Sequence, residues 1–232
     1  MNLTNLLLAS VINWESIGIA SLETLGMVLI SAVIAYAIGL PLGVILSITS
    51  KNGICKCRPV NLILGFIVNV MRSIPCLLLI VITIPLSNAL IGKGNWSGYW
   101  YSMIIPLVFS SFAYIARVVE QSLTDVPTGE VEAVTTLGAS KWQIITKVLL
   151  PEAKISLLIG GLVTVVNIIG YTSFAGYIGA GGLIAYAFTL GYYGSNTWGM
   201  WFAVLVVVII VQVIQEFGLM LVKKLDKRRK LS

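Results

Sequence analysis

Side chains that could act on a small solute are sparse in this chain, and four of them share one apolar segment. Thr164, Asn167, Tyr171 and Phe174 are spaced by three, four and three residues. In an α-helix this spacing places them on one face. Two interpretations stay open. The stripe forms hydrogen bonds between helices, or it is the weakly polar wall of a translocation path, past which a solute moves without being held.

The sequence contains no arrangement typical of catalysis or nucleotide binding. It has no histidine, which removes a common general base and the commonest metal ligand. Gly92-Lys93-Gly94 lacks the upstream glycine and the hydroxyl residue of a phosphate-binding loop. Cys55 and Cys57 fall in a segment expected in the cytoplasm, where thiols stay reduced, and no further ligand cluster accompanies them. We therefore expect neither an enzyme nor a metal site, and no cofactor bound by this chain.

A second group of candidate residues lies in the polar segment 130–151, between two strongly apolar regions. Thr128 is expected to cap a short helix, and Glu130 and Glu132 would place negative charge in its first turn. The apolar residues of this helix recur every third position and so share one face. They are Val131, Val134 and Leu137.

The same segment predicts a second short helix after a glycine. Gly138 ends the first helix because it tolerates a left-handed backbone, Ser140 caps the second, and Pro151 stops it. The second helix carries along one side Trp142, Ile145 and Leu149. Two interpretations follow: an ordinary loop whose apolar faces rest on its own bundle, or a compact knob that seats in another protein.

Composition defines the setting in which these elements must lie. Hydrophobic residues make up 58% of the 232 residues and charged residues only 10%, with a mean hydropathy of +0.98. Soluble domains carry about 25% charged residues, so we predict an integral membrane protein. The net charge of +6 arises from basic residues at the ends of apolar runs, which is the positive-inside pattern and not a nucleic-acid patch.

The apolar runs predict an all-α polytopic bundle with five transmembrane helices. They cover approximately 24–50, 72–90, 94–116, 155–190 and 198–222. Basic loops and the basic end place the C-terminus in the cytoplasm and the N-terminus outside. We predict an interfacial segment at 1–23, a membrane domain at 24–222 with a cytoplasmic loop at 125–151, and a basic tail at 223–232.

Proline and glycine within these spans carry further expectations. Pro75 and Pro85 should bend the second span. Gly39 and Gly43 flank Pro41, and we interpret this group as close helix packing with a proline kink. Arg72 is expected near the cytoplasmic half of its helix, where it can pair or extend to the interface.

The spacing of Glu132-Ala133, Gly138 and Val148-x-Leu150-Pro151 resembles the EAA loop of ABC-importer permeases. That loop reads Glu-Ala-Ala, three residues, Gly, nine residues and Ile-x-Leu-Pro. Val134 and Val148 are mild departures from it. In that family the loop is a coupling helix that docks in a groove of a separate ATPase subunit.

Further motifs over roughly residues 20–222 resemble the permease subunit of the methionine ABC importer family. They are Leu22-Glu-Thr-Leu25, Arg72-Ser-Ile-Pro75, Arg117-x-x-Glu120, Pro127-Thr-Gly129 and the glycine-rich segment 170–183. Family members often read Ser-Ala-Met-Gly-Gly where this chain reads Thr172-Ser-Phe-Ala-Gly176, so Phe174 replaces a methionine at the expected gate.

The resemblance implies a set of partners and roles. Two identical permeases would bind two cytoplasmic ATPases, which hold ATP and Mg, and an extracytoplasmic substrate-binding lipoprotein would deliver methionine in the bacterial inner membrane. The implied ATPase-coupling residues are Glu132, Ala133, Val134, Leu137, Gly138, Trp142, Leu150 and Pro151. The implied path and gate residues are Arg72, Ser73, Thr164, Asn167, Tyr171 and Phe174.

Other functions remain open at this stage. The substrate could be another small amino acid or nutrient, because specificity in this class rests mainly in the binding protein. A self-contained secondary transporter or channel would place an acid or histidine mid-span, whereas Glu216 lies near the cytoplasmic end of its span. A membrane scaffold with no transport role is the third alternative.

Overall fold

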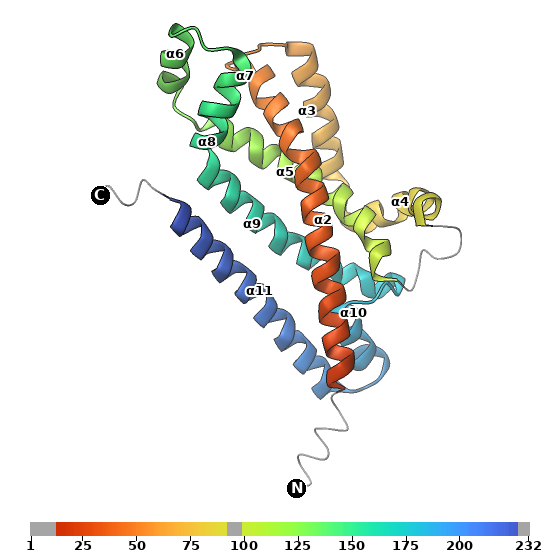
Figure 1. Cartoon of the computed structure of the whole chain (residues 1–232). Helices are drawn as coiled ribbons and strands as arrows, with labels where there is room; N and C mark the ends of the chain where they lie inside the picture. Colours follow the sequence, from red (N-terminus) through yellow and green to blue (C-terminus); the bar gives the residue numbers. More distant parts are fainter. Residues whose placement is uncertain (1–12, 92–98, 227–232) are drawn as a thin grey trace. The chain divides into compact units, whose positions relative to one another are not determined.

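The computed structural model describes residues 13–91 and 99–226, and every regular element within these two ranges is helical (Figure 1). The predicted all-α class is therefore confirmed. In chain order the elements are α2 (Trp14–Thr49), α3 (Arg58–Ser73), α4 (Cys76–Ile91), η1 (Trp100–Met103), α5 (Ile104–Thr124), α6 (Thr128–Thr136), α7 (Lys141–Ile144), η2 (Ile145–Leu149), α8 (Leu150–Glu152), α9 (Lys154–Tyr171), η3 (Thr172–Ile178), α10 (Leu183–Phe188), η4 (Thr189–Tyr193) and α11 (Thr197–Leu225).

Within these ranges, four segments are long and apolar enough to cross a membrane. They are Trp14–Thr49, Trp100–Thr124, Lys154–Gly176 and Thr197–Leu225. A fifth span results when α3 and α4 are counted as one broken span, which agrees with the predicted number. The predicted sides of the two termini stay a prediction.

The first three spans differ from their predicted bounds, and the second starts with α3 at Arg58 instead of at residue 72. Helix α2 begins at Trp14 and continues without a break through residue 24, so the described part of the predicted interfacial segment belongs to the helix of the first span. Residues 1–12 lie outside the described residues. The third span begins with η1 at Trp100 and reaches Thr124, further along the chain than the predicted end at residue 116.

The second span is broken at a proline. Helix α3 ends at Ser73, Ile74 is extended with φ −81° and ψ 122°, and α4 starts at Cys76. A proline ring disfavours helical backbone in the residue before it, so Pro75 accounts for the extended Ile74. Pro85 lies inside α4 and does not end it. The predicted bend at Pro75 is thus a complete interruption of the helix.

The chain divides into two compact units, each built from three stretches of sequence. Unit 1 comprises 1–33, 75–108 and 165–216, and unit 2 comprises 34–74, 109–164 and 217–232. The main core of unit 1 is formed by Met27, Val28, Ile80, Met103, Leu107, Ile168, Ile169, Ala175 and Ala180. The core of unit 2 is formed by Leu46, Val68, Ala113 and Ala116.

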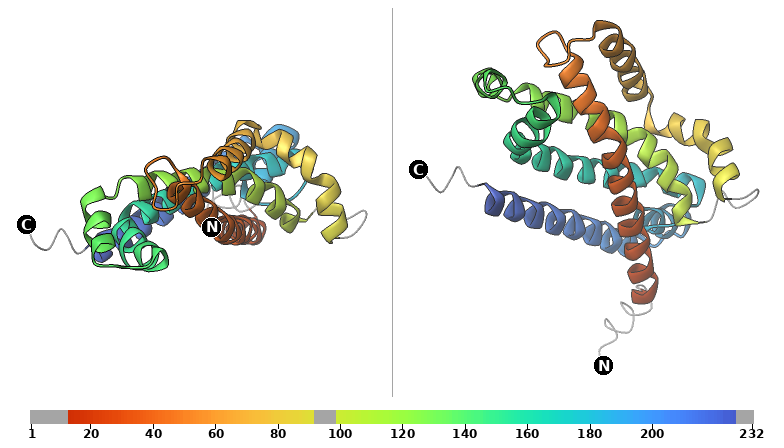
Figure 2. Two further views of the ribbon diagram at one scale, coloured as in Figure 1. Left: turned by 90° about the horizontal axis from the view of Figure 1, so that it is seen from above. Right: turned by 45° about the horizontal axis from the view of Figure 1, so that its top comes forward.

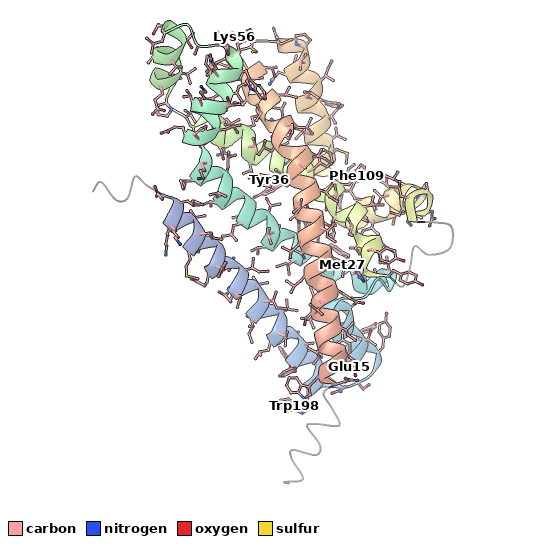
Figure 3. The ribbon with its side chains drawn as sticks, in the orientation of Figure 1. Glu15, Met27, Tyr36, Lys56, Phe109 and Trp198 are labelled. Carbon is pink, nitrogen blue, oxygen red and sulfur yellow. The ribbon has the colours of Figure 1, made fainter. Side chains whose placement is uncertain are left out.

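In unit 2, α2 approaches α5 closely at two glycines. A Cβ built on Gly39 would lie 2.7 Å from the carbonyl oxygen of Phe112, and one on Gly43 would lie 2.5 Å from that of Ala116. Only a residue without a side chain allows this approach, so the predicted packing role of these glycines is confirmed. The Tyr36 hydroxyl, labelled in Figure 3, donates a 2.7 Å hydrogen bond to the Leu157 carbonyl and joins α2 to α9.

The outer faces of the long helices are apolar. In α11 the most apolar stretch of 18 residues contains no residue that is buried within the chain. Such a surface is costly in water and is the expected surface toward lipid.

Candidate functional site

The first helix of the polar loop is α6, and it begins as predicted but with a different cap. Pro127 is the N-cap residue, and no side chain caps the helix. The predicted capping by Thr128 is therefore wrong by one position, because Pro127 already supplies the non-helical backbone before the first turn. Glu130 lies in the first turn, whereas Glu132 lies beyond it, so only Glu130 is placed to interact with the positive end of the helix dipole.

Gly138 ends the first helix in the predicted way. Its φ is +81°, and its N–H donates to the Thr135 carbonyl at 3.0 Å. The Ala139 N–H donates to the Val134 carbonyl at 3.3 Å. A Cβ built on Gly138 would meet no heavy atom within 4 Å. The backbone conformation, and not a lack of space, is what requires glycine here.

Ser140 starts the second helix with a capping box, as predicted. Its Oγ accepts from the Gln143 N–H at 3.3 Å, and its own N–H donates to Gln143 Oε1 at 2.8 Å. The helical run continues as the π-helix η2 and then α8, which ends at Glu152. Pro151 therefore lies inside the last helical turn, and the helical run ends one residue after this proline and not before it. The π-turn immediately precedes this proline, which has no backbone N–H to offer.

The second helix of the loop buries two of the three side chains that were predicted to share one side. Trp142 is 72% exposed, whereas Ile144, Ile145 and Leu149 are buried. Ile145 and Leu149 are therefore buried as predicted, whereas the prediction is wrong for Trp142, and Ile144 is buried in its place. Leu137 is 85% exposed, and Val131 and Val134 are half-buried.

Leu137 and Trp142 thus form an exposed apolar pair on either side of the Gly138 turn. The loop is held by its own capping box and by its inward isoleucines, and the pair is left without cover in this chain.

The other candidate coupling residues of the loop, Glu132, Ala133, Leu150 and Pro151, lie in different environments. Glu132 lines a cavity of about 190 Å³ together with Ser50 and Gly53 of the turn between α2 and α3. Ala133 and Pro151 are exposed, and Leu150 is half-buried. The structure therefore brings Glu132 to a neighbouring turn that sequence spacing could not indicate.

The end of α3 places Arg72 beside polar groups of α5. Arg72 is exposed and lines a cavity of about 410 Å³ that Tyr114, Arg117 and Glu120 also line. The Ser73 hydroxyl is bonded to the Asn69 carbonyl of its own helix at 2.8 Å, so Ser73 has a local role in this structure.

Arg117 belongs to a motif found in the sequence, but the motif did not indicate what this residue does. In the structure Arg117 holds two helices together. It forms an ion pair with Glu120. Its Nη2 donates to the Gly65 carbonyl at 3.0 Å and to Asn69 Oδ1 at 2.8 Å. These bonds join α5 to α3 within unit 2. The sequence could indicate the pairing with Glu120, because this acid lies three residues after Arg117. No sequence pattern indicated the two partners in α3, Gly65 and Asn69.

The predicted polar stripe is only partly one helix face. Helix α9 ends at Tyr171, and Phe174 lies in the 3₁₀-helix η3. Thr164 is buried and donates to the Gly160 carbonyl of its own helix at 2.7 Å. Asn167 is half-buried, and Tyr171 and Phe174 pack against the core of unit 1. Phe174 therefore leaves the predicted α-helical stripe.

Glu23 and Thr24 of α2 hold the glycine-rich turn of unit 1 in place. The sequence motifs gave these two residues no role. Glu23 accepts a 2.8 Å hydrogen bond from the Gly182 N–H, and the Thr24 hydroxyl oxygen accepts one of 2.8 Å from the Leu183 N–H. These amides begin α10 and have no partners inside that helix. The partners are separated by 159 residues, so no local pattern could have paired them.

Comparisons with known proteins match nearly the whole chain. Residues 39–231 match the family described as "Binding-protein-dependent transport system inner membrane component". The chain is 39% identical to the probable D-methionine transport system permease protein of Vibrio cholerae, over 90% of this chain and 92% of that protein. It is 38% identical to the methionine import system permease protein of Bacillus subtilis, over 79% and 82%.

A solved structure supports the same relationship. It shows the MetNI methionine ABC transporter in an inward-facing conformation, and one of its chains is 35% identical to this chain. The match has a TM-score of 0.87 and covers 91% of this chain and 97% of the other.

Proposed function

This chain belongs to the family of inner membrane components of binding-protein-dependent transport systems, and from that premise we propose that it is the permease subunit of an ATP-driven methionine importer. The chain is a multi-pass protein of the bacterial inner membrane and a transport component, not an enzyme. Methionine is proposed because the relatives from Vibrio cholerae and Bacillus subtilis are named for its transport.

The exposed apolar pair at the Gly138 turn is the observation that carries the proposed coupling to an ATPase. Leu137 and Trp142 are 85% and 72% exposed on a loop that its basic neighbours assign to the cytoplasm. Burying each side chain in a partner would contribute about 1.5–3 kcal/mol. The capping box and the buried isoleucines hold the turn in shape before it binds, so little ordering is required on docking.

The partners and cofactors follow from this assignment. Two copies of the chain would pair around one path, two cytoplasmic ATPase subunits would hold ATP and Mg, and an extracytoplasmic lipoprotein would deliver the substrate. The matched MetNI structure is that of a methionine ABC transporter, which supports this composition. A purified complex with one permease per two ATPases would refute the permease dimer.

The path and gate assignments remain part of the proposal. Arg72, Ser73, Asn167, Tyr171 and Phe174 keep the role in the path and gate that the family resemblance implies. Thr164 donates its hydroxyl to its own helix, so we assign it a lining role without a hydrogen bond to the solute.

The test of coupling uses Leu137→Asp, with Leu137→Met as the matched control that keeps an apolar side chain of similar volume. Each variant is co-expressed with an ABC ATPase subunit that assembles with the wild-type chain, and the purified complex is assayed for bound ATPase and for uptake into vesicles. Leu137→Asp should lose the ATPase and the uptake, and Leu137→Met should keep both. Wild-type assembly and uptake with Leu137→Asp would overturn the coupling role.

The substrate is tested separately with the reconstituted complex and its binding protein. Uptake of radiolabelled L-methionine is measured in competition with D-methionine and with other small apolar amino acids. Competition by methionine alone supports the assignment. Equal competition by other amino acids would reject methionine and leave the permease function intact, and uptake that survives removal of the ATPase would reject the importer itself.

A further inference from the structure

A basic cavity lies in unit 2 at the turn between α2 and α3. It has a volume of about 610 Å³, and its lining includes Thr49, Lys51, Lys56, Arg58, Asn61 and Leu62. Lys56, which belongs to this turn, is labelled in Figure 3. The cavity lining contains three cationic side chains and no carboxylate.

The three cations are available to an external anion. Lys51, Lys56 and Arg58 are exposed. In the part of the chain that the structure describes, an ion pair joins Arg117 and Glu120. No ion pair in that part involves Lys51, Lys56 or Arg58. Helix α3 starts at Arg58 with no side-chain cap, so its unpaired first N–H groups add positive potential at the same place.

The cavity is held in shape by hydrogen bonds of the turn. The Cys57 N–H donates to the Thr49 carbonyl at 3.2 Å, and the Cys55 N–H donates to the Ile48 carbonyl at 2.9 Å. Asn61 Nδ2 donates to the Leu46 carbonyl at 2.8 Å. The basic side chains therefore project from a fixed frame around the cavity.

An exposed apolar face of α3 begins at the edge of this cavity. Leu62 lines the cavity and is 59% exposed, and Phe66, one helical turn further, is 70% exposed. Ile63 beside them is 62% exposed. In Figures 1 and 2, α3 runs back alongside the end of α2 that carries the turn, so this face extends from the turn along the helix.

We propose that the cavity binds the phosphate headgroup of an anionic phospholipid of the cytoplasmic leaflet, with the acyl chains along Leu62, Ile63 and Phe66. A cationic cavity that continues into an exposed apolar helix face matches a molecule with an anionic head and a hydrocarbon tail. The positive-inside pattern alone requires basic residues near the ends of spans. It does not require three of them to line one cavity.

The binding test uses the permease–ATPase complex, stripped of lipid in detergent and titrated with phosphatidylglycerol or phosphatidylcholine. Native mass spectrometry measures the bound lipid. Removing all three charges as Lys51→Gln, Lys56→Gln and Arg58→Gln should weaken phosphatidylglycerol binding by on the order of a hundredfold, at roughly fivefold for each charge. The matched control, Lys223→Gln with Lys224→Gln, removes two exposed basic residues of α11. This control should change the binding of phosphatidylglycerol by less than about threefold.

A second measurement uses the wild-type chain and does not depend on the folding of a variant. Cys57 lines the cavity, and Cys55 does not; both thiols are free and half-buried. Phosphatidylglycerol should slow alkylation of Cys57 much more than that of Cys55, as resolved by peptide mass spectrometry, and phosphatidylcholine should not.

Four results would overturn the proposal. Equal loss of binding in the α11 control would show diffuse surface attraction, and equal binding of phosphatidylcholine would remove the role of charge. Displacement of phosphatidylglycerol by millimolar inorganic phosphate would identify a free-phosphate site. Cross-linking of Cys57 between two copies, unaffected by lipid, would show that a second copy covers this face.

Discussion

Gly138 allows the most direct test of how the polar loop is built. Its φ of +81° is unfavourable for any L-residue with a side chain. No heavy atom lies within 4 Å of a Cβ built there, so the cost of a substitution is the cost of backbone conformation alone. That cost is about 1–2 kcal/mol for Gly138→Ala, less for Gly138→Asn because asparagine tolerates this region, and more for the β-branched Gly138→Val.

Hydrogen exchange of the loop amides measures this cost in the permease alone. The N–H groups of Gly138 and Ala139 donate to carbonyls of α6, and they exchange when the turn opens. A loss of 1–2 kcal/mol corresponds to exchange that is about 5–30 times faster. The expected order of exchange rates is wild type, Gly138→Asn, Gly138→Ala, Gly138→Val.

Function should follow the same order if the turn transmits movement between the ATPase and the permease. All three variants should insert in the membrane at wild-type levels, and uptake per hydrolysed ATP should fall most in Gly138→Val. Exchange rates that are equal across the series would refute the strain argument. Wild-type uptake with Gly138→Val, despite faster exchange, would show that the turn has no coupling role.

Substitutions at three further residues test other contacts. Ser140→Ala should destabilise the second loop helix by about 1 kcal/mol through loss of the capping box, seen as faster exchange of the Gln143 amide. Arg117→Met should lower the free energy of unfolding by about 1–3 kcal/mol because it leaves the half-buried Glu120 unpaired, and Arg117→Lys should fall between it and wild type in thermal unfolding. Thr24→Val keeps the side-chain shape but removes the acceptor for a buried amide, at about 1–3 kcal/mol, and exchange of the Leu183 N–H should accelerate while the loop amides stay unchanged.

The loop was predictable where the signals were local. Gly138 and Ser140 were assigned correctly because a left-handed turn and a capping box depend on residues within a few positions. The buried side of the second helix was assigned correctly for Ile145 and Leu149 but not for Trp142, and Ile144 is buried in its place. Trp142, Ile144 and Ile145 are all apolar and nearly adjacent, so a short helix offers two possible inward faces, and contacts outside the loop decide between them.

Long-range features were beyond sequence patterns. The break at Pro75 follows from proline chemistry, and a bend was expected there. The pairing of Glu23 with Gly182 depends on how the chain folds back over 159 residues, and no periodicity carries that information. Phe174 left the predicted stripe because the helix tightens to 3₁₀ after Tyr171, a change that spacing alone does not show.

The interleaving of the two units has a consequence for biosynthesis. Each unit requires a stretch from the last part of the chain, beginning at residue 165 for unit 1 and at residue 217 for unit 2. At about 5–20 residues per second, the 159 residues between Glu23 and Gly182 take roughly 8–32 s to synthesise. During that interval the first helix must persist in the membrane without its final partner. A chain that stops before residue 165 therefore lacks the last stretch of both units, and neither unit is complete.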